Sequence, residues 1–177
     1  MTRLFVALDL PDEVRASLLR LQSGVPGARW QTREQLHLTL RFIGEADGRD
    51  AAAIDEMLAT IGDARFSLEL KTVGEFGGKT PRALWAGVAP NAGLKHLQRK
   101  IETAMQRLGL PAEERKYTPH VTLARLRGTP SGAVMDYITD HALYASGAFE
   151  VPAFTLFSSH LSPNGSIYTP ERVYPLR

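Results

Sequence analysis

The 177-residue sequence contains no cysteine at all. This absence excludes disulfide bridges, thiolate metal sites and cysteine nucleophiles. The sequence also has no continuous apolar segment of membrane-spanning length. The longest uncharged stretch, residues 151–170, is interrupted by prolines and hydroxyl residues, so it is not apolar over the ~20 residues that a bilayer requires. The first ten residues contain Asp9 and lack the hydrophobic core of a secretion signal. We therefore expect a cytoplasmic protein with no membrane partner.

The sequence also lacks a strong excess of positive or negative charge, because the formal net charge is only +2. With 44% hydrophobic and 23% charged residues, the composition is that of a globular protein, which we expect to form a single domain over residues 1–177. Arginine outnumbers lysine 16 to 5. Because the planar guanidinium group suits bidentate contact with phosphate, this excess is a mild hint of an anionic substrate.

Strand-like and helix-like segments alternate along the chain. Helical spacing of apolar residues predicts a helix that starts after Pro11 and stops at Gly24, a helix over 54–61 closed by Gly62 in the left-handed conformation, a long helix over 92–108 and a short helix over 132–143. Strand patterns lie at 3–10, 36–43, 66–76, 83–88, 118–126, 148–151, 154–161 and 167–176. A turn signal at residues 162–165 predicts that the last two strands form a hairpin. The expected fold class is α+β, with helices on the outer faces of sheets.

One short motif occurs twice, each time within an apolar strand pattern. It reads His37-Leu38-Thr39-Leu40 in the first half of the chain and His120-Val121-Thr122-Leu123 in the second. Residues two apart in a strand point to the same side, so each motif places an imidazole and a hydroxyl on one face. Two copies in one chain are what a site of roughly two-fold symmetry requires.

Such a pair suits acid–base catalysis on a phosphoester. Histidine titrates near pH ~6.5, so one imidazole can accept a proton while the other donates one. The hydroxyls of Thr39 and Thr122 can donate hydrogen bonds to the non-bridging phosphate oxygens, and this chemistry needs no metal and no cofactor. Two alternatives stay open. The histidines are structural residues of half-buried strands, or they bind a metal, for which the strands offer no carboxylates at ligand spacing.

The two motifs and their flanking residues resemble the RNA 2',3'-cyclic phosphodiesterases, also called 2'-5' RNA ligases, of the two-histidine phosphoesterase superfamily. Residues 3–11 resemble the family's opening strand and helix start. Residues 36–44 and 117–125 resemble its two signature segments, and residues 161–165 with Tyr168 resemble its closing hairpin. The resemblance spans essentially the whole chain.

This resemblance implies two pseudo-symmetric lobes of antiparallel sheet, with one histidine motif from each lobe at a central cleft. It implies a monomer that opens the 2',3'-cyclic phosphate of RNA ends, such as those of tRNA fragments, to a 2'-phosphate. By the same analogy His37 is the proton donor to the leaving 3' oxygen and His120 is the proton acceptor that activates water, although the residues alone allow either order. A 5'-hydroxyl RNA end in place of water gives a 2'-5' linkage.

Arg125 and Phe42 are carried over from the family as substrate-binding residues, each five positions beyond a histidine. In a regular strand, a residue five positions beyond a histidine points to the opposite face. A strand end or a bulge must therefore redirect both side chains if they are to reach the cleft. In the cleft, Arg125 is expected to clamp phosphate and Phe42 to stack on a base. Otherwise Phe42 is ordinary core. Tyr117 either stacks on a base or covers the loop before the second motif.

Two other functions stay open at the level of sequence. A related two-histidine phosphoesterase would act on a small cyclic nucleotide, and only the shape of the pocket separates that substrate from RNA. A nucleotide-binding or RNA-binding module would keep the cleft without turnover, which the presence of both histidines disfavours.

Overall fold

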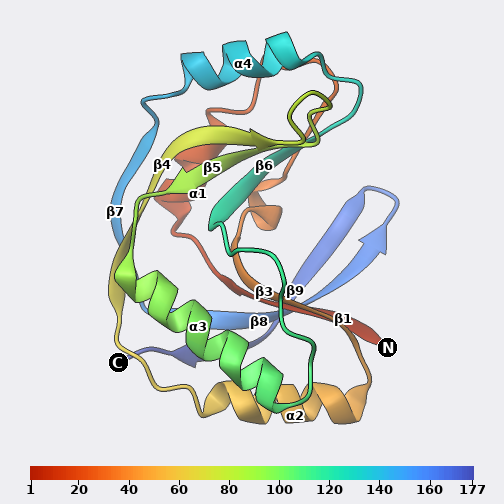
Figure 1. The fold of residues 1–177 in the computed structure, drawn as a ribbon, viewed down its shortest axis with the longest axis vertical. Coiled ribbons are helices and arrows are strands. Elements are labelled where there is room, and N and C mark those ends of the chain that lie inside the picture. Colours follow the sequence, from red (N-terminus) through yellow and green to blue (C-terminus); the bar gives the residue numbers. More distant parts are fainter.

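Nine strands form one antiparallel sheet that curls into a half-barrel in the computed structural model, which describes all of residues 1–177 (Figure 1). The order along the sheet is β7-β4-β5-β6-β3-β1-β8-β9, and β2 also pairs with β6. The strands are β1 (Thr2–Leu8), β2 (Ala28–Trp30), β3 (Leu38–Ala46), β4 (Phe66–Phe76), β5 (Ala83–Val88), β6 (His120–Leu126), β7 (Ala145–Val151), β8 (Ala153–Ser162) and β9 (Gly165–Pro175). The helices are α1 (Asp12–Leu19), α2 (Gly48–Ala59), α3 (Ala92–Arg107) and α4 (Ser131–Asp140), with a short 3-10 helix η1 (Arg33–Gln35).

The sheet divides into two halves that meet at one residue pair. β7, β4, β5 and β6 form one half, and β3, β1, β8 and β9 form the other. Leu38 of β3 pairs with Val121 of β6 where the halves join. α4 lies at one end of the molecule, whereas α2 and α3 lie toward the opposite end (Figure 1). The expected α+β fold with two lobes is confirmed.

β1 is buried on both of its faces, because the sheet has a core on each side of it. Leu4, Val6 and Leu8 belong to the main core of 35 buried residues, to which all four α-helices contribute. Phe5 and Ala7 point to the opposite face and form a small second cluster with Phe157. This second cluster lies beside His37, since the ring centroids of Phe157 and His37 are only 4.5 Å apart.

The helix predictions hold for position but not always for the ends. α3 begins where the Asn91 side chain accepts a hydrogen bond from the backbone N–H of Leu94, and Gly109 follows its end with a φ of 91°. α1 ends at Leu19, several residues before Gly24.

The prediction that Gly62 caps the second helix in the left-handed conformation is wrong. α2 ends at Ala59, and Thr60 closes it in the right-handed conformation with its N–H bonded to carbonyl groups of the last turn. Gly62 has no positive φ. The backbone after α2 therefore does not require a glycine at position 62 to end the helix.

Two short elements were not predicted from the sequence. β2 and η1 have three residues each, which is too short for any periodicity to register. The predicted hairpin is confirmed, since β8 and β9 pair down to Ser162 opposite Gly165. The Gln35 side chain donates a hydrogen bond of 2.9 Å to the carbonyl of Ser166, which ties the hairpin turn to η1.

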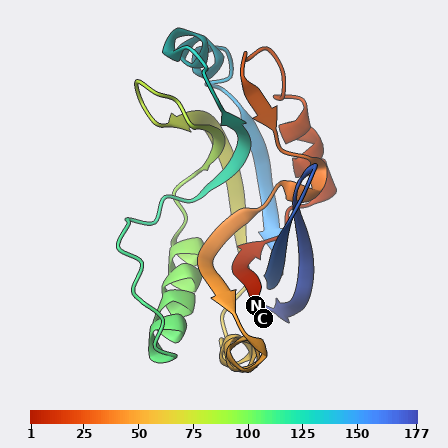
Figure 2. The ribbon, with the colours of Figure 1, turned by 90° about the vertical axis from the view of Figure 1, so that its right-hand side faces the viewer.

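A view from the side places the segment between α3 and β6 on the side of the sheet opposite the β8–β9 hairpin (Figure 2). None of the helices is long and apolar enough to cross a membrane.

Candidate active site

The pairing of Leu38 with Val121 fixes how the two His-x-Thr motifs face each other. Both side chains are fully buried in the main core. Because neighbours along a strand point to opposite faces, the residues on either side of this pair lie on the other face of the sheet. His37 and Thr39 flank Leu38 along the chain, and His120 and Thr122 flank Val121, so both motifs present an imidazole and a hydroxyl to this other face beside the junction.

A bulge in β3 turns Phe42 to the same face as the histidines. Thr39 and Arg41 pair with consecutive residues of β1, so Leu40 is the extra residue of the bulge. Leu40 and Arg41 are both buried, and Phe42 then returns to the histidine face. Its side chain is 66% exposed, and its ring centroid lies 6.0 Å from that of Phe5. Phe42 is therefore not an ordinary core residue.

β6 carries the matching bulge. Thr122 and Ala124 pair with consecutive residues of β5, so Leu123 is the extra residue. Arg125 consequently faces the same side as Thr122, and it lies opposite Arg29 of β2. In both strands the bulge comes three residues after the histidine. These two bulges explain how Phe42 and Arg125, each five residues beyond a histidine, point to the same face as the histidines.

His37 is buried beside aromatic rings and an ion pair. Its Nε2 lies 3.5 Å from Nη2 of Arg15 and 3.9 Å from Oδ1 of Asp9, and Arg15 and Asp9 are themselves paired. Tyr168 packs edge-on, with 5.7 Å between ring centroids. Burial and then the positive charge of Arg15 lower the pKa of His37 to about 4, against the opposing effect of Asp9. His37 is therefore neutral near pH 7 in the free protein.

His120 has aromatic neighbours of its own. Its ring centroid lies 4.9 Å from that of Phe76 and 6.3 Å from that of Trp85. Nδ1 lies 2.7 Å from the carbonyl oxygen of Thr118, so Nδ1 carries a hydrogen and Nε2 remains available to substrate. Burial lowers the pKa of His120, while the Thr118 carbonyl acts in the opposite direction.

Two glycines make room for the aromatic wall behind His120. A Cβ atom added at Gly74 would lie 2.3 Å from the Trp85 indole, and one at Gly87 would lie 3.2 Å from it. The indole also packs against Phe76, with ring centroids 5.5 Å apart. Small residues in β4 and β5 therefore set the depth of this wall.

The two histidines line two hollows rather than one enclosed pocket. His120 lines a cavity of about 700 Å³ together with Thr39, Phe42, Phe76, Arg82 and Tyr117. His37 lines a second cavity, of about 450 Å³, together with Asp9, Arg15, Phe157 and Tyr168. Since Thr39 is only two residues from His37, both hollows border the junction of β3 and β6.

Tyr117 fastens the segment before β6 to β3. Its hydroxyl donates a hydrogen bond of 2.9 Å to the carbonyl oxygen of Thr39, and burial raises its pKa, so it remains a neutral donor. The ring is half-buried and packs against the main core. This geometry favours the loop-covering role of Tyr117 over base stacking.

Most of the residues that surround the histidines were not predicted from the sequence. The Asp9–Arg15 pair and the aromatic rings of Phe76, Phe157 and Trp85 were not assigned to the site. Asp9 lies within the opening segment that resembles the family, which was a usable signal. The other residues come from separate strands and a helix, and no local pattern links them. No group of three or more histidine, aspartate or glutamate side chains could hold a metal ion.

The curled sheet with its four helices is a fold that solved structures share. A protein of Thermus thermophilus superposes with a TM-score of 0.83 at 27% identity, covering 99% of this chain and 98% of that chain. Escherichia coli LigT complexed with 3'-AMP gives a TM-score of 0.81 at 27% identity, with the same coverage.

Sequence comparison gives the family. The RNA 2',3'-cyclic phosphodiesterase of Archaeoglobus fulgidus is 32% identical over 176 residues, which cover 97% of this chain and 99% of that protein. The model of the 2'-5' RNA ligase superfamily matches residues 10–162. The chain belongs to the 2'-5' RNA ligase superfamily, and the resemblance drawn from the motifs is confirmed.

Proposed function

We propose that this protein hydrolyses the 2',3'-cyclic phosphate of RNA ends to a 2'-phosphate, by acid–base catalysis from His37 and His120 and without a metal. The hydrolase class follows from the family, because curated relatives that align over nearly the whole chain are named RNA 2',3'-cyclic phosphodiesterases. The observation that carries the proposal for this chain is the register at Leu38 and Val121, which sets both His-x-Thr motifs on one face.

In the hydrolytic step, the oxygen of water forms a bond to phosphorus while the bond between phosphorus and the 3' oxygen breaks. His120 takes a proton from water through Nε2, and His37 gives a proton to the 3' oxygen. The product carries a 2'-phosphate and a free 3'-hydroxyl, and exchange with solvent restores both histidines. Each imidazole contributes about 100- to 10,000-fold to the rate.

His37 must take up a proton before it can act as the donor, since it is neutral in the free protein. The substrate supplies the driving force, because a phosphate anion next to the ring raises the pKa of His37. The carboxylate of Asp9, 3.9 Å from Nε2, acts in the same direction and Arg15 acts against it. Binding of the anionic RNA end therefore favours the protonated form of His37, which is the form that can act as the proton donor.

The remaining groups on this face hold the phosphate and the terminal base. Thr39 and Thr122 donate hydrogen bonds to the non-bridging oxygens, where fixed dipoles stabilise the negative charge of the transition state. Arg125 clamps phosphate through its planar fork. The exposed ring of Phe42 stacks on the terminal base.

Ligation uses the same groups with a different nucleophile. When the 5'-hydroxyl of a second RNA replaces water, His120 takes the proton of that hydroxyl. The new bond joins the 5' oxygen to phosphorus, the bond to the 3' oxygen breaks, and the product is a 2'-5' phosphodiester.

A small nucleotide is the second candidate substrate. The solved structure of Escherichia coli LigT with 3'-AMP is a complex with a mononucleotide. The chemistry at the two histidines would be the same, so the length of the preferred substrate decides between the candidates.

The test is incubation of the purified protein, with EDTA present, with an oligoribonucleotide that ends in a 2',3'-cyclic phosphate. We expect an oligonucleotide with a 2'-phosphate end, identified by its resistance to an enzyme that removes only 3'-phosphates. Binding by folded protein without any product would overturn the proposal in favour of a binding module, and loss of activity with EDTA would overturn its metal-independence.

A further inference from the structure

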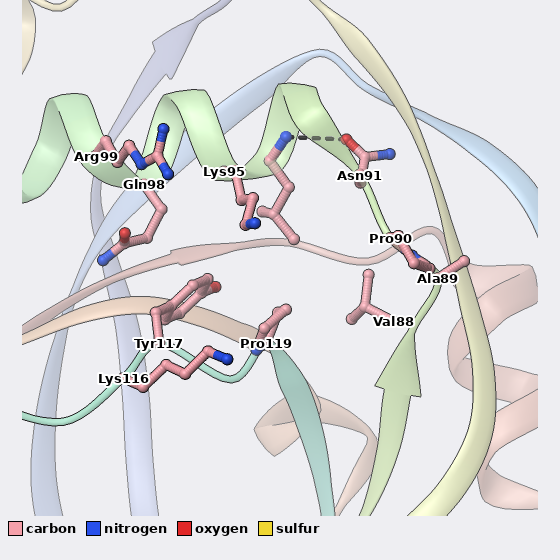
Figure 3. A pocket seen from close by; sticks show the side chains of 11 residues that line it. Val88, Ala89, Pro90, Asn91, Lys95, Gln98, Arg99, Lys116, Tyr117 and Pro119 are labelled. Atoms are coloured by element: carbon pink, nitrogen blue, oxygen red, sulfur yellow. Dashed lines mark hydrogen bonds between the residues drawn. The ribbon is translucent and has the colours of Figure 1, made fainter.

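A further cavity, of about 450 Å³, lies between α3 and the segment that leads into β6 (Figure 3). α3 lines it with Lys95, Gln98 and Arg99, and the facing segment lines it with Lys116 and Tyr117. Val88, Ala89, Pro90, Asn91, Leu94 and Pro119 complete the lining. We refer to this cavity as the basic groove.

The charge of the basic groove is of one sign. Lys95, Arg99 and Lys116 line it, and no acidic residue does. All three side chains are exposed, and none takes part in an ion pair of the protein. Lys100 on the same helix is different, because its amino group lies 3.9 Å from Asp63. Three unneutralised cations around one hollow raise the local concentration of anions.

The basic groove adjoins the cavity that holds His120. Gln98, Lys116 and Tyr117 line both. The Tyr117 hydroxyl donates a hydrogen bond to the carbonyl of Thr39, so one wall of the groove is fixed to the strand that carries the first motif. An anionic chain whose end lies at His120 therefore has a basic path leading away from it along α3.

We propose that the basic groove binds the phosphodiester backbone of RNA on the 5' side of the reacting end, and that it makes an oligoribonucleotide a better substrate than a mononucleotide. This inference rests on the proposed function, because it takes the cyclic phosphate to lie beside His120. The cations contact phosphates and not base edges, so the groove selects for chain length without selecting a sequence.

The experiment compares two substrates and two double variants. The substrates are a ten-nucleotide RNA with a 2',3'-cyclic phosphate end and adenosine 2',3'-cyclic phosphate. The test variant is Lys95→Ala with Arg99→Ala. The control is Arg49→Ala with Arg107→Ala, which removes the same charge from two exposed positions that do not line the groove.

At low salt, the test variant should lower kcat/KM for the RNA by about 10-fold and change kcat/KM for the mononucleotide by less than about two-fold, whereas the control should change neither. The slope of log(KM) for the RNA against log(salt) should become shallower by about 0.7 for each phosphate of the single strand that the variant no longer neutralises. Equal loss on both substrates, or no loss on either, would overturn the groove proposal and leave hydrolysis standing.

If the wild-type protein hydrolyses neither substrate, the proposed function fails and the groove can still be judged by binding. Fluorescence anisotropy with a labelled ten-nucleotide RNA that ends in a 3'-phosphate measures affinity without turnover. Weaker binding by the test variant than by the control would support the groove, and equal affinity would overturn it.

Discussion

Leu38 of β3 lies directly opposite Val121 of β6, and both side chains are fully buried at the junction of the two halves of the sheet. This contact lies between the two histidine motifs and sets their relative position. A change of one residue in the register would send a whole motif to the core face, because side chains alternate with a period of two. Burial of these two apolar side chains on the core face is therefore consistent with both motifs facing the opposite, polar side.

The order of the two histidines can be tested by replacing the bridging 3' oxygen of the cyclic phosphate with sulphur. A thiolate leaves without needing a proton, so loss of the acid matters little for such a substrate. We expect His37→Ala and His120→Ala each to lose about 100- to 10,000-fold in kcat on the oxygen substrate. On the sulphur substrate, His37→Ala should recover most of the loss and His120→Ala should not. Recovery by His120→Ala instead would reverse the assigned roles.

Phe42→Ala should weaken substrate binding while leaving the protein folded. The ring is largely exposed, so the free energy of unfolding should change by less than about 1 kcal/mol. Base stacking on an aromatic ring is worth about 1–3 kcal/mol, so KM should rise about 5- to 100-fold with little change in kcat. Leu143→Ala, at a side chain that is 97% exposed, is the matched control. An equal rise in KM for a substrate without a terminal base would argue against stacking.

Arg125→Ala and Arg125→Lys separate charge from geometry at the proposed phosphate clamp. A hydrogen bond to a charged group is worth about 1.5–3 kcal/mol, so kcat/KM should fall about 10- to 100-fold in the alanine variant. The lysine variant keeps the charge but loses the planar fork, so it should recover only part of the activity. Arg127→Ala, two residues further on and also exposed, is the control. Wild-type activity in Arg125→Ala would remove this residue from the site.

The buried, neutral His37 should make stability depend on pH. Its pKa of about 4 in the folded protein is below its ordinary value of 6.5, so between these pH values the unfolded chain holds a proton that the folded protein does not. The free energy of unfolding should therefore fall by about 3 kcal/mol as pH drops from 6.5 to 4 through this residue alone. Urea unfolding at several pH values measures the slope. A His37→Gln variant with the wild-type slope would show that another group is responsible.

Much of this architecture could be predicted from local sequence patterns. The repeated His-x-Thr motif, the long apolar stripe of α3 and the turn that closes the β8–β9 hairpin each depend on residues that are close together in the chain. Their periodicity is visible in the sequence because each element buries one face, regardless of which element it packs against. The motifs also carried the family resemblance that the comparisons confirm.

The bulges at Leu40 and Leu123 could not be predicted in this way. A bulge is a property of two paired strands, and neither sequence alone specifies which residue the partner leaves unpaired. Those two bulges decide that Phe42 and Arg125 share a face with the histidines.

Which chemical groups the two motifs supply follows from the amino-acid order alone: the imidazoles of His37 and His120 and the hydroxyls of Thr39 and Thr122, in a chain rich in arginine and without a thiol. How those groups behave depends on the three-dimensional fold. The low pKa of His37 depends on burial among Phe157 and Tyr168 and on the charge of Arg15, which reach it from different elements. Desolvation and Coulomb interactions depend on distance in space, and distance in space follows from strand pairing and packing, not from position along the chain.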